Sequence, residues 1–117
     1  MNEEKKETTI EECIEHGAHI RKRYRACLLE VGKSPDYHIY DLTLKELRGM
    51  RASDAKRFLL KLVAYYLNLC DEEKALFVRE ILEKDRHYRF WFYDTSFPAA
   101  EFERRRNNAY RNLRMAL

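Results

Sequence analysis

Apolar residues recur with helical spacing along most of the chain. Thr9 and Glu12 have the spacing of a capping box, in which side chains satisfy the backbone donors that begin a helix. Apolar or small positions then follow one helical face as far as Gly32: Ile10, Cys13, Ile14, Gly17, Ile20, Tyr24, Cys27, Leu28 and Val31. This pattern predicts a long amphipathic helix that ends at the glycine.

Three more helices are predicted between residues 42 and 82. Thr43 and Glu46 form a second capping-box pattern, for a short helix that stops near Gly49. Ser53 can cap a third helix through about Leu69, which is apolar around much of its circumference and is therefore expected at the centre of the core. Asp71 can cap a fourth helix, whose apolar side carries Ala75, Leu76, Val78, Ile81 and Leu82.

The last part of the chain combines an aromatic run with a basic helix. Residues 86–95 are compatible with a short strand or a short helix, and the helical neighbours favour a helix. After Pro98, apolar residues predict an amphipathic helix to the C-terminus: Ala99, Phe102, Ala109, Tyr110, Leu113, Ala116 and Leu117. We expect residues 1–8 to be a flexible tail and 9–117 to form one domain, divided into 9–70 and 71–117.

The composition supports an all-α fold of about five helices. The 117 residues include only three Gly and two Pro, too few for the turns of a sandwich or barrel, while 45% are hydrophobic. The three cysteines lack paired spacing, so we expect reduced thiols in a cytoplasmic protein without a membrane span. No catalytic signature, metal-ligand set or nucleotide-binding loop is present, so we expect no enzyme, cofactor, metal or small-molecule substrate.

The net charge is only +3, but basic residues concentrate in two stretches, residues 21–25 and residues 104–114. Arginine forks onto phosphates and guanine edges, so a helix with one apolar face and an Arg/Asn outer face suits the DNA major groove. The predicted DNA-binding residues are Ser96, Arg104, Arg105, Asn108, Arg111 and Arg114. A second basic set could contact flanking phosphates or a protein partner: Arg21, Lys22, Arg23, Arg25, Arg86 and Arg89.

Residues 71–117 resemble the helix-turn-helix at the C-terminus of bacterial sigma factors and the related phage-type transcription activators of the ArpU kind. The resemblance rests on Phe102 followed by basic residues and then Ala109, Leu113 and Arg114, with Glu72-Glu73-Lys74, Phe77 and Ile81-Leu82 upstream. It implies that 96–113 carry the DNA-contacting turn and helix. It also implies that Arg104, Arg105, Asn108 and Arg111 point outward and Phe102, Ala109 and Leu113 inward.

The sequence thus predicts a small transcription regulator that binds double-stranded DNA, with RNA polymerase and a second copy of the chain as candidate partners. Two alternatives stay open: a helical adaptor or inhibitor that binds a protein, and binding of RNA or single strands through residues 86–93. DNA binding and the adaptor role differ in whether the arginine side chains of residues 104–111 are free or buried against the rest of the chain. Pairing of its guanidiniums with Glu15, Asp71 or Glu80 would favour the adaptor.

Overall fold

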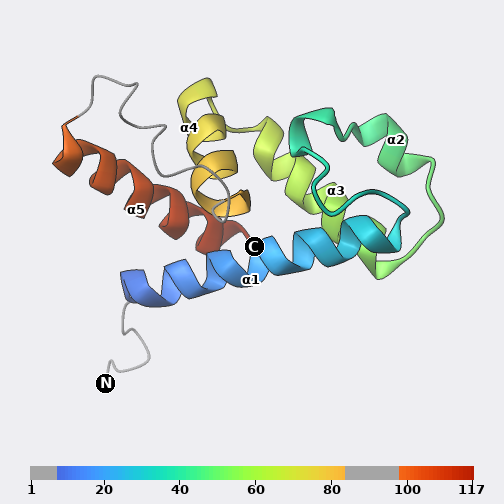
Figure 1. The fold of residues 1–117 in the computed structure, drawn as a ribbon, viewed down its shortest axis with the longest axis horizontal. Coiled ribbons are helices and arrows are strands. Elements are labelled where there is room, and N and C mark those ends of the chain that lie inside the picture. The colour runs from blue at the N-terminus through green and yellow to red at the C-terminus, as the bar shows by residue number, and fades with distance from the viewer. Residues whose placement is uncertain (1–7, 84–97) are drawn as a thin grey trace.

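The computed structural model describes residues 8–83 and 98–117, and within these ranges every regular element is a helix (Figure 1). The predicted all-α class is confirmed. In chain order the elements are α1 (Ile10–Glu30), the 3₁₀ turn η2 (Ile39–Asp41), α2 (Leu44–Arg48), α3 (Asp54–Leu67), α4 (Asp71–Leu76), the π-helical η3 (Phe77–Leu82) and α5 (Ala99–Ala116). None of the helices in the described ranges is both long and apolar enough to cross a membrane.

Local capping determines where the first helices begin, as predicted. The Thr9 hydroxyl accepts a hydrogen bond from the Glu12 amide at 3.2 Å, and the Glu12 carboxylate accepts one from the Thr9 amide at 3.1 Å. Ser53 caps α3 by accepting from the Lys56 amide at 3.1 Å. The chain leaves α1 through Gly32, whose φ of 85° is a conformation that glycine adopts without steric cost.

Two predicted caps differ from the structure. Thr43 caps α2 through the Glu46 amide, but the Glu46 carboxylate pairs with Lys33 instead of returning to Thr43, because Lys33 lies on the neighbouring loop. The cap of α4 is Cys70, one residue before Asp71, and the Cys70 amide donates to Glu73 at 2.9 Å. Glu73, the third residue of α4, therefore caps the helix by accepting a hydrogen bond from the N-cap amide.

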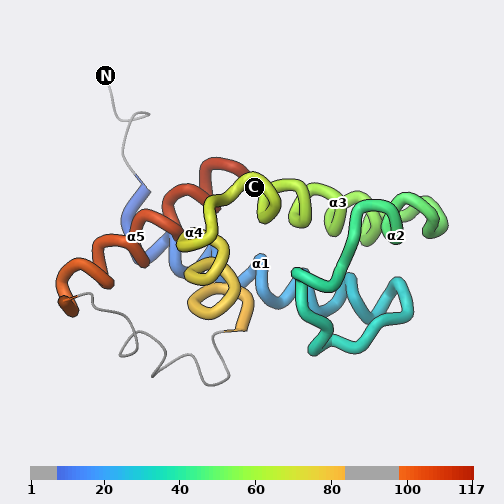
Figure 2. The backbone as a smooth tube through the Cα atoms, turned by 90° about the horizontal axis from the view of Figure 1, so that it is seen from above, coloured from blue at the N-terminus to red at the C-terminus, as the bar shows by residue number. Residues whose placement is uncertain are grey.

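The central helix is α1, not α3. The 21-residue α1 contacts α3 towards one end and η3 and α5 towards the other (Figures 1 and 2). In Figure 1, α5 lies beside the N-terminal half of α1, α3 meets its C-terminal half, and α4 lies between α5 and α3. Only one face of α3 is buried, and Leu67 remains 50% exposed, so its apolar circumference is wider than the surface it buries.

The predicted fourth helix changes its hydrogen-bonding pattern halfway. Asp71–Leu76 is α-helical, whereas Phe77–Leu82 is π-helical, a rare arrangement that inserts an extra residue per turn. Side chains from two other helices bind its carbonyls: Arg21 Nη1 donates to the Ile81 oxygen at 3.0 Å, and the Tyr110 hydroxyl donates to the Glu80 oxygen at 3.1 Å. These contacts join α1 and α5 to η3.

Candidate nucleic-acid interface

The last helix, α5, has one buried side and one exposed side. It begins after Pro98, and Tyr110 and Leu113 are buried where it contacts α1 and η3. Phe102 and Ala109 are half-buried, so the predicted inward side is confirmed in the middle of α5, whereas Ala99 and Ala116 at its two ends are exposed. The opposite side is an exposed stripe, here called the outer stripe, made of Arg104, Asn108, Arg111, Asn112 and Met115.

The outer stripe offers hydrogen-bond donors and contains no carboxylate. Arg104, Asn108 and Arg111 follow at helical spacing, so their side chains project to the same side over two turns. Arg111 Nη1 lies 3.4 Å from the carbonyl oxygen of Thr8, the residue before the N-cap of α1, and this contact tethers Arg111 weakly to the start of α1. Exposed arginine and asparagine side chains are the groups that read purine edges in a DNA groove.

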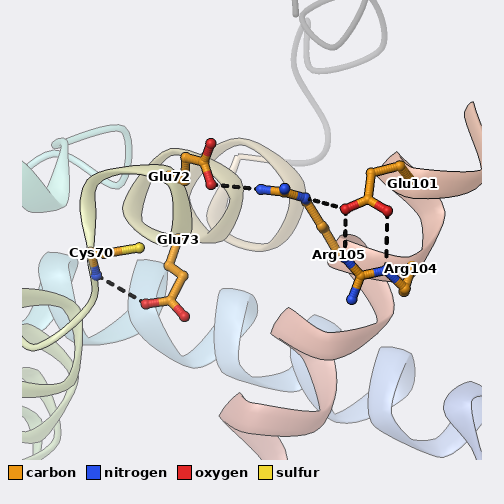
Figure 3. Close-up of polar contacts among 6 residues, drawn as sticks. All are labelled: Cys70, Glu72, Glu73, Glu101, Arg104 and Arg105. Atoms are coloured by element: carbon orange, nitrogen blue, oxygen red, sulfur yellow. Dashed lines mark hydrogen bonds and ion pairs between the residues drawn. The ribbon is translucent and has the colours of Figure 1, made fainter. Parts of the chain in front are cut away.

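At the N-terminal end of α5, two predicted DNA-binding arginines share one carboxylate (Figure 3). Glu101 accepts from Arg104 through Nε at 3.1 Å and Nη2 at 2.5 Å, and from Arg105 Nε at 2.7 Å. Arg105 Nη1 also binds Glu72 of α4 at 2.6 Å. The carboxylates that hold these guanidiniums are therefore Glu101 and Glu72, neither of which was among those expected.

These hydrogen bonds also determine the charge state of the cluster. Hydrogen bonds from Arg104 and then Arg105 lower the pKa of Glu101 to about 2, so its carboxylate is ionised at neutral pH. Arg104 nevertheless remains 61% exposed, whereas Arg105 is 34% exposed because it lies against α4. The cluster is accessible from solvent on the Arg104 side.

A groove of about 690 Å³ separates α4 from α5. Its apolar lining comes from α3 and the turn after it, from α4, from the start of η3 and from α5: Tyr65, Leu69, Ala75, Leu76, Phe77 and Ala109. Its polar lining includes Asp71, Glu72 and Glu73 on one side and Arg104, Arg105, Asn108 and Asn112 on the other. The Arg105–Glu72 ion pair bridges the two sides.

The basic run on α1 does not form one patch. Successive residues on a helix are turned by about 100°, so the run divides around the axis. Arg21 reaches η3 through the Ile81 carbonyl, and the Arg23 guanidinium lies 4.4 Å from the centre of the Phe58 ring on α3. Lys22 is exposed and Arg25 is half-buried.

The remaining predicted residues have different positions. Arg114 is exposed, but its charge acts on His16 of α1, which places it at the edge of α5 rather than on the outer stripe. Ser96, Arg86 and Arg89, together with the aromatic run and the turn of the predicted helix-turn-helix, lie outside the described residues.

Cysteine and histidine side chains belong to the packing around α1. Cys13 and Cys27 are buried in the core, as predicted for small apolar residues, and burial raises the pKa of the Cys27 thiol. Cys70 is exposed at the start of α4. Within residues 8–83 and 98–117, no group of three His, Cys, Asp or Glu side chains could hold a metal ion.

Comparisons of the chain with family models, curated proteins and solved structures find no significant match. The case for a function therefore rests on the chain's own residues. Sequence reasoning missed Glu101 and Glu72 as partners of the predicted site. The spacing of Glu101 to Arg104 and Arg105, three and four residues on, could have indicated the first contact. The second joins separate helices and has no local signal.

Proposed function

We propose that the chain binds double-stranded DNA, with the outer stripe of α5 in the major groove. The observation that supports this best is that Arg104, Asn108 and Arg111 face solvent on one side of a helix anchored by its opposite side. A major groove admits an α-helix with its side chains directed at base edges. The resemblance of residues 71–117 to sigma-factor helix-turn-helix units supports the same proposal and makes transcription its biological context.

The test is fluorescence anisotropy with random-sequence duplex DNA between about 50 and 200 mM salt, where phosphate contacts weaken steeply. Arg111→Glu should weaken binding about tenfold or more, because it replaces a DNA-facing cation with an anion. Arg51→Glu makes the same charge change on an exposed residue near α2 and should have a much smaller effect. Equal losses in both variants, or no binding at the lowest salt, would disprove the assignment.

The groove between α4 and α5 favours a second candidate, binding of a basic amphipathic helix from a protein partner. From Arg104 to Asn112 the groove follows about 12 Å of α5, the length over which a helix presents apolar anchors at i, i+3 and i+7. Arg104 and Arg105 bind Glu101 and Glu72, whereas no ion pair among the described residues holds Asp71 or Glu73. The groove lining therefore carries a net negative charge beside an apolar floor, which matches lysines beside leucines.

This candidate can be tested with a designed helix that carries leucines on one face and lysines on the other. Ala75→Phe would fill the groove and should abolish binding, whereas Ala26→Phe, on the exposed side of α1, should leave it unchanged. The same peptide with glutamates in place of lysines should not bind. Equal affinity for both peptides would show that the acidic rim plays no part.

A further inference from the structure

The arrangement of Arg104 and Arg105 around Glu101 is that of a two-arginine anion site whose ligand is part of the chain. Three hydrogen bonds from two guanidiniums converge on one carboxylate, and two of them come from the fork of Arg104. Arginine forks bind carboxylates and phosphates with the same geometry. Glu72 holds the far side of Arg105 from α4, so that guanidinium is positioned between two anions (Figure 3).

We infer that Glu101 occupies the position of a DNA phosphate and competes with the DNA backbone for Arg104 and Arg105. This inference rests on the proposed DNA binding and adds a regulatory residue to it. A phosphate that approaches the N-terminal end of α5 must displace the carboxylate or share its donors. Glu101 thereby weakens non-specific binding, which depends on phosphate contacts, more than it weakens base reading by Asn108 and Arg111 further along the helix.

A neighbouring carboxylate lacks this geometry and provides the control. Glu103 belongs to the same turn of α5 and carries the same charge, but it is 66% exposed and its nearest approach to Arg106 is 3.9 Å. Glu101 is expected to stabilise the start of α5 whether or not it competes with DNA, since anions stabilise the first turn of a helix. Only Glu101 combines that effect with contacts to two predicted DNA-binding residues.

The decisive experiment compares Glu101→Gln with Glu103→Gln in the full chain, using the duplex assay described above. Glu101→Gln should bind random duplex about tenfold more tightly, and its log–log salt dependence should steepen by about 0.9 for each additional phosphate that the protein neutralises, up to about 1.8 for two. Glu103→Gln should show only the smaller increase in affinity of a general charge change. Equal increases in affinity and equal salt slopes in the two variants would overturn the inference.

A double-mutant cycle separates competition at the arginines from general repulsion. In an Arg104→Gln/Arg105→Gln background, Glu101→Gln should increase the affinity no more than Glu103→Gln does. Persistence of the full increase there would overturn the inference. Glu72→Gln removes one of the two carboxylates that bind Arg105 and leaves Glu101 in place, so it should give a smaller increase than Glu101→Gln. It serves as the second variant if Glu101→Gln unfolds in circular dichroism.

The outcomes also separate this inference from the proposed function. If the unmodified chain binds duplex and Glu101→Gln binds no better than Glu103→Gln, the inference fails and the DNA-binding proposal stands. If neither the unmodified chain nor any variant binds at about 50 mM salt, DNA binding itself fails and the inference fails with it.

Discussion

At the scale of single residues, Gly17 sets the distance between α1 and α5. A β-carbon at this position would lie 2.6 Å from Tyr110 Cε1 and 2.8 Å from Cδ1, and the Tyr110 ring is fully buried. Gly17→Ala should therefore lower the free energy of unfolding by about 1 to 2 kcal/mol, because overpacking outweighs the better helix propensity of alanine. Gly49→Ala is the control, since its β-carbon meets nothing closer than 3.6 Å. Denaturant melts in which both variants are stabilised would contradict the prediction.

A second prediction at this scale concerns His16 of α1, which is half-buried near the C-terminal end of α5. Burial, then the charges of Arg114 and His19, lower its pKa from 6.5, although a backbone hydrogen bond with Leu117 opposes them. The unfolded chain then binds the proton first as pH falls, so the stability that neutral His16 contributes above pH 6.5 is progressively lost below it. His16→Gln should flatten the fall in melting temperature between about pH 7 and pH 5. An unchanged pH slope would show that His16 is not responsible.

At the scale of elements, the π-helical η3 depends on a side chain from another helix. The Tyr110 hydroxyl donates to the Glu80 carbonyl, a buried contact between α5 and η3. Tyr110→Phe keeps the ring and removes this donor, so it should cost about 1 to 3 kcal/mol of unfolding free energy. Tyr37→Phe removes an exposed hydroxyl whose bond to the Asp41 oxygen is 3.4 Å long and should cost little. Equal stability of the two variants in urea titrations would argue that the Tyr110 contact contributes nothing.

An element can be predicted from the sequence when the contacts that form it join residues close together in the chain. Thr9, Thr43 and Ser53 were identified as caps because each contacts an amide three residues away. The π-helical turn was missed because its carbonyl contacts involve Arg21 and Tyr110, distant in sequence.

In the candidate site, too, local features were predictable and contacts between separate helices were not. Helical periodicity predicted an outward Arg/Asn side of α5, and the structure confirms that Arg104, Asn108 and Arg111 are exposed. The fourth residue predicted to point outward, Arg105, is instead half-buried because it lies against α4. The Glu72 contact to Arg105 could not be predicted, since it depends on how α4 lies beside α5. The division of the α1 basic run likewise depends on which helices pack against Arg21 and Arg23.

At the scale of the whole molecule, α1 packs against two groups of helices, α2 and α3 as one half of the fold and α4, η3 and α5 as the other. The two halves therefore share α1 as their packing partner. Leu59 of α3 and Leu113 of α5 are fully buried in the same core cluster, although their helices contact different parts of α1. Neither half can therefore lose its packing without exposing part of the helix that the other half needs. A core of this kind predicts one cooperative unfolding transition.

Leu59→Ala and Leu113→Ala provide the test of this coupling. Each should lower the free energy of unfolding by about 2 to 5 kcal/mol, the usual cost of a cavity at a buried leucine. Far-ultraviolet circular dichroism, which reports helix content, and near-ultraviolet circular dichroism, which reports tyrosine packing, should give coincident transitions in both variants. If Leu113→Ala instead shifted one phase and left a second phase at its original midpoint, α5 and η3 would unfold independently of α2 and α3. Substitutions in the proposed DNA-binding helix would then leave the rest of the fold intact.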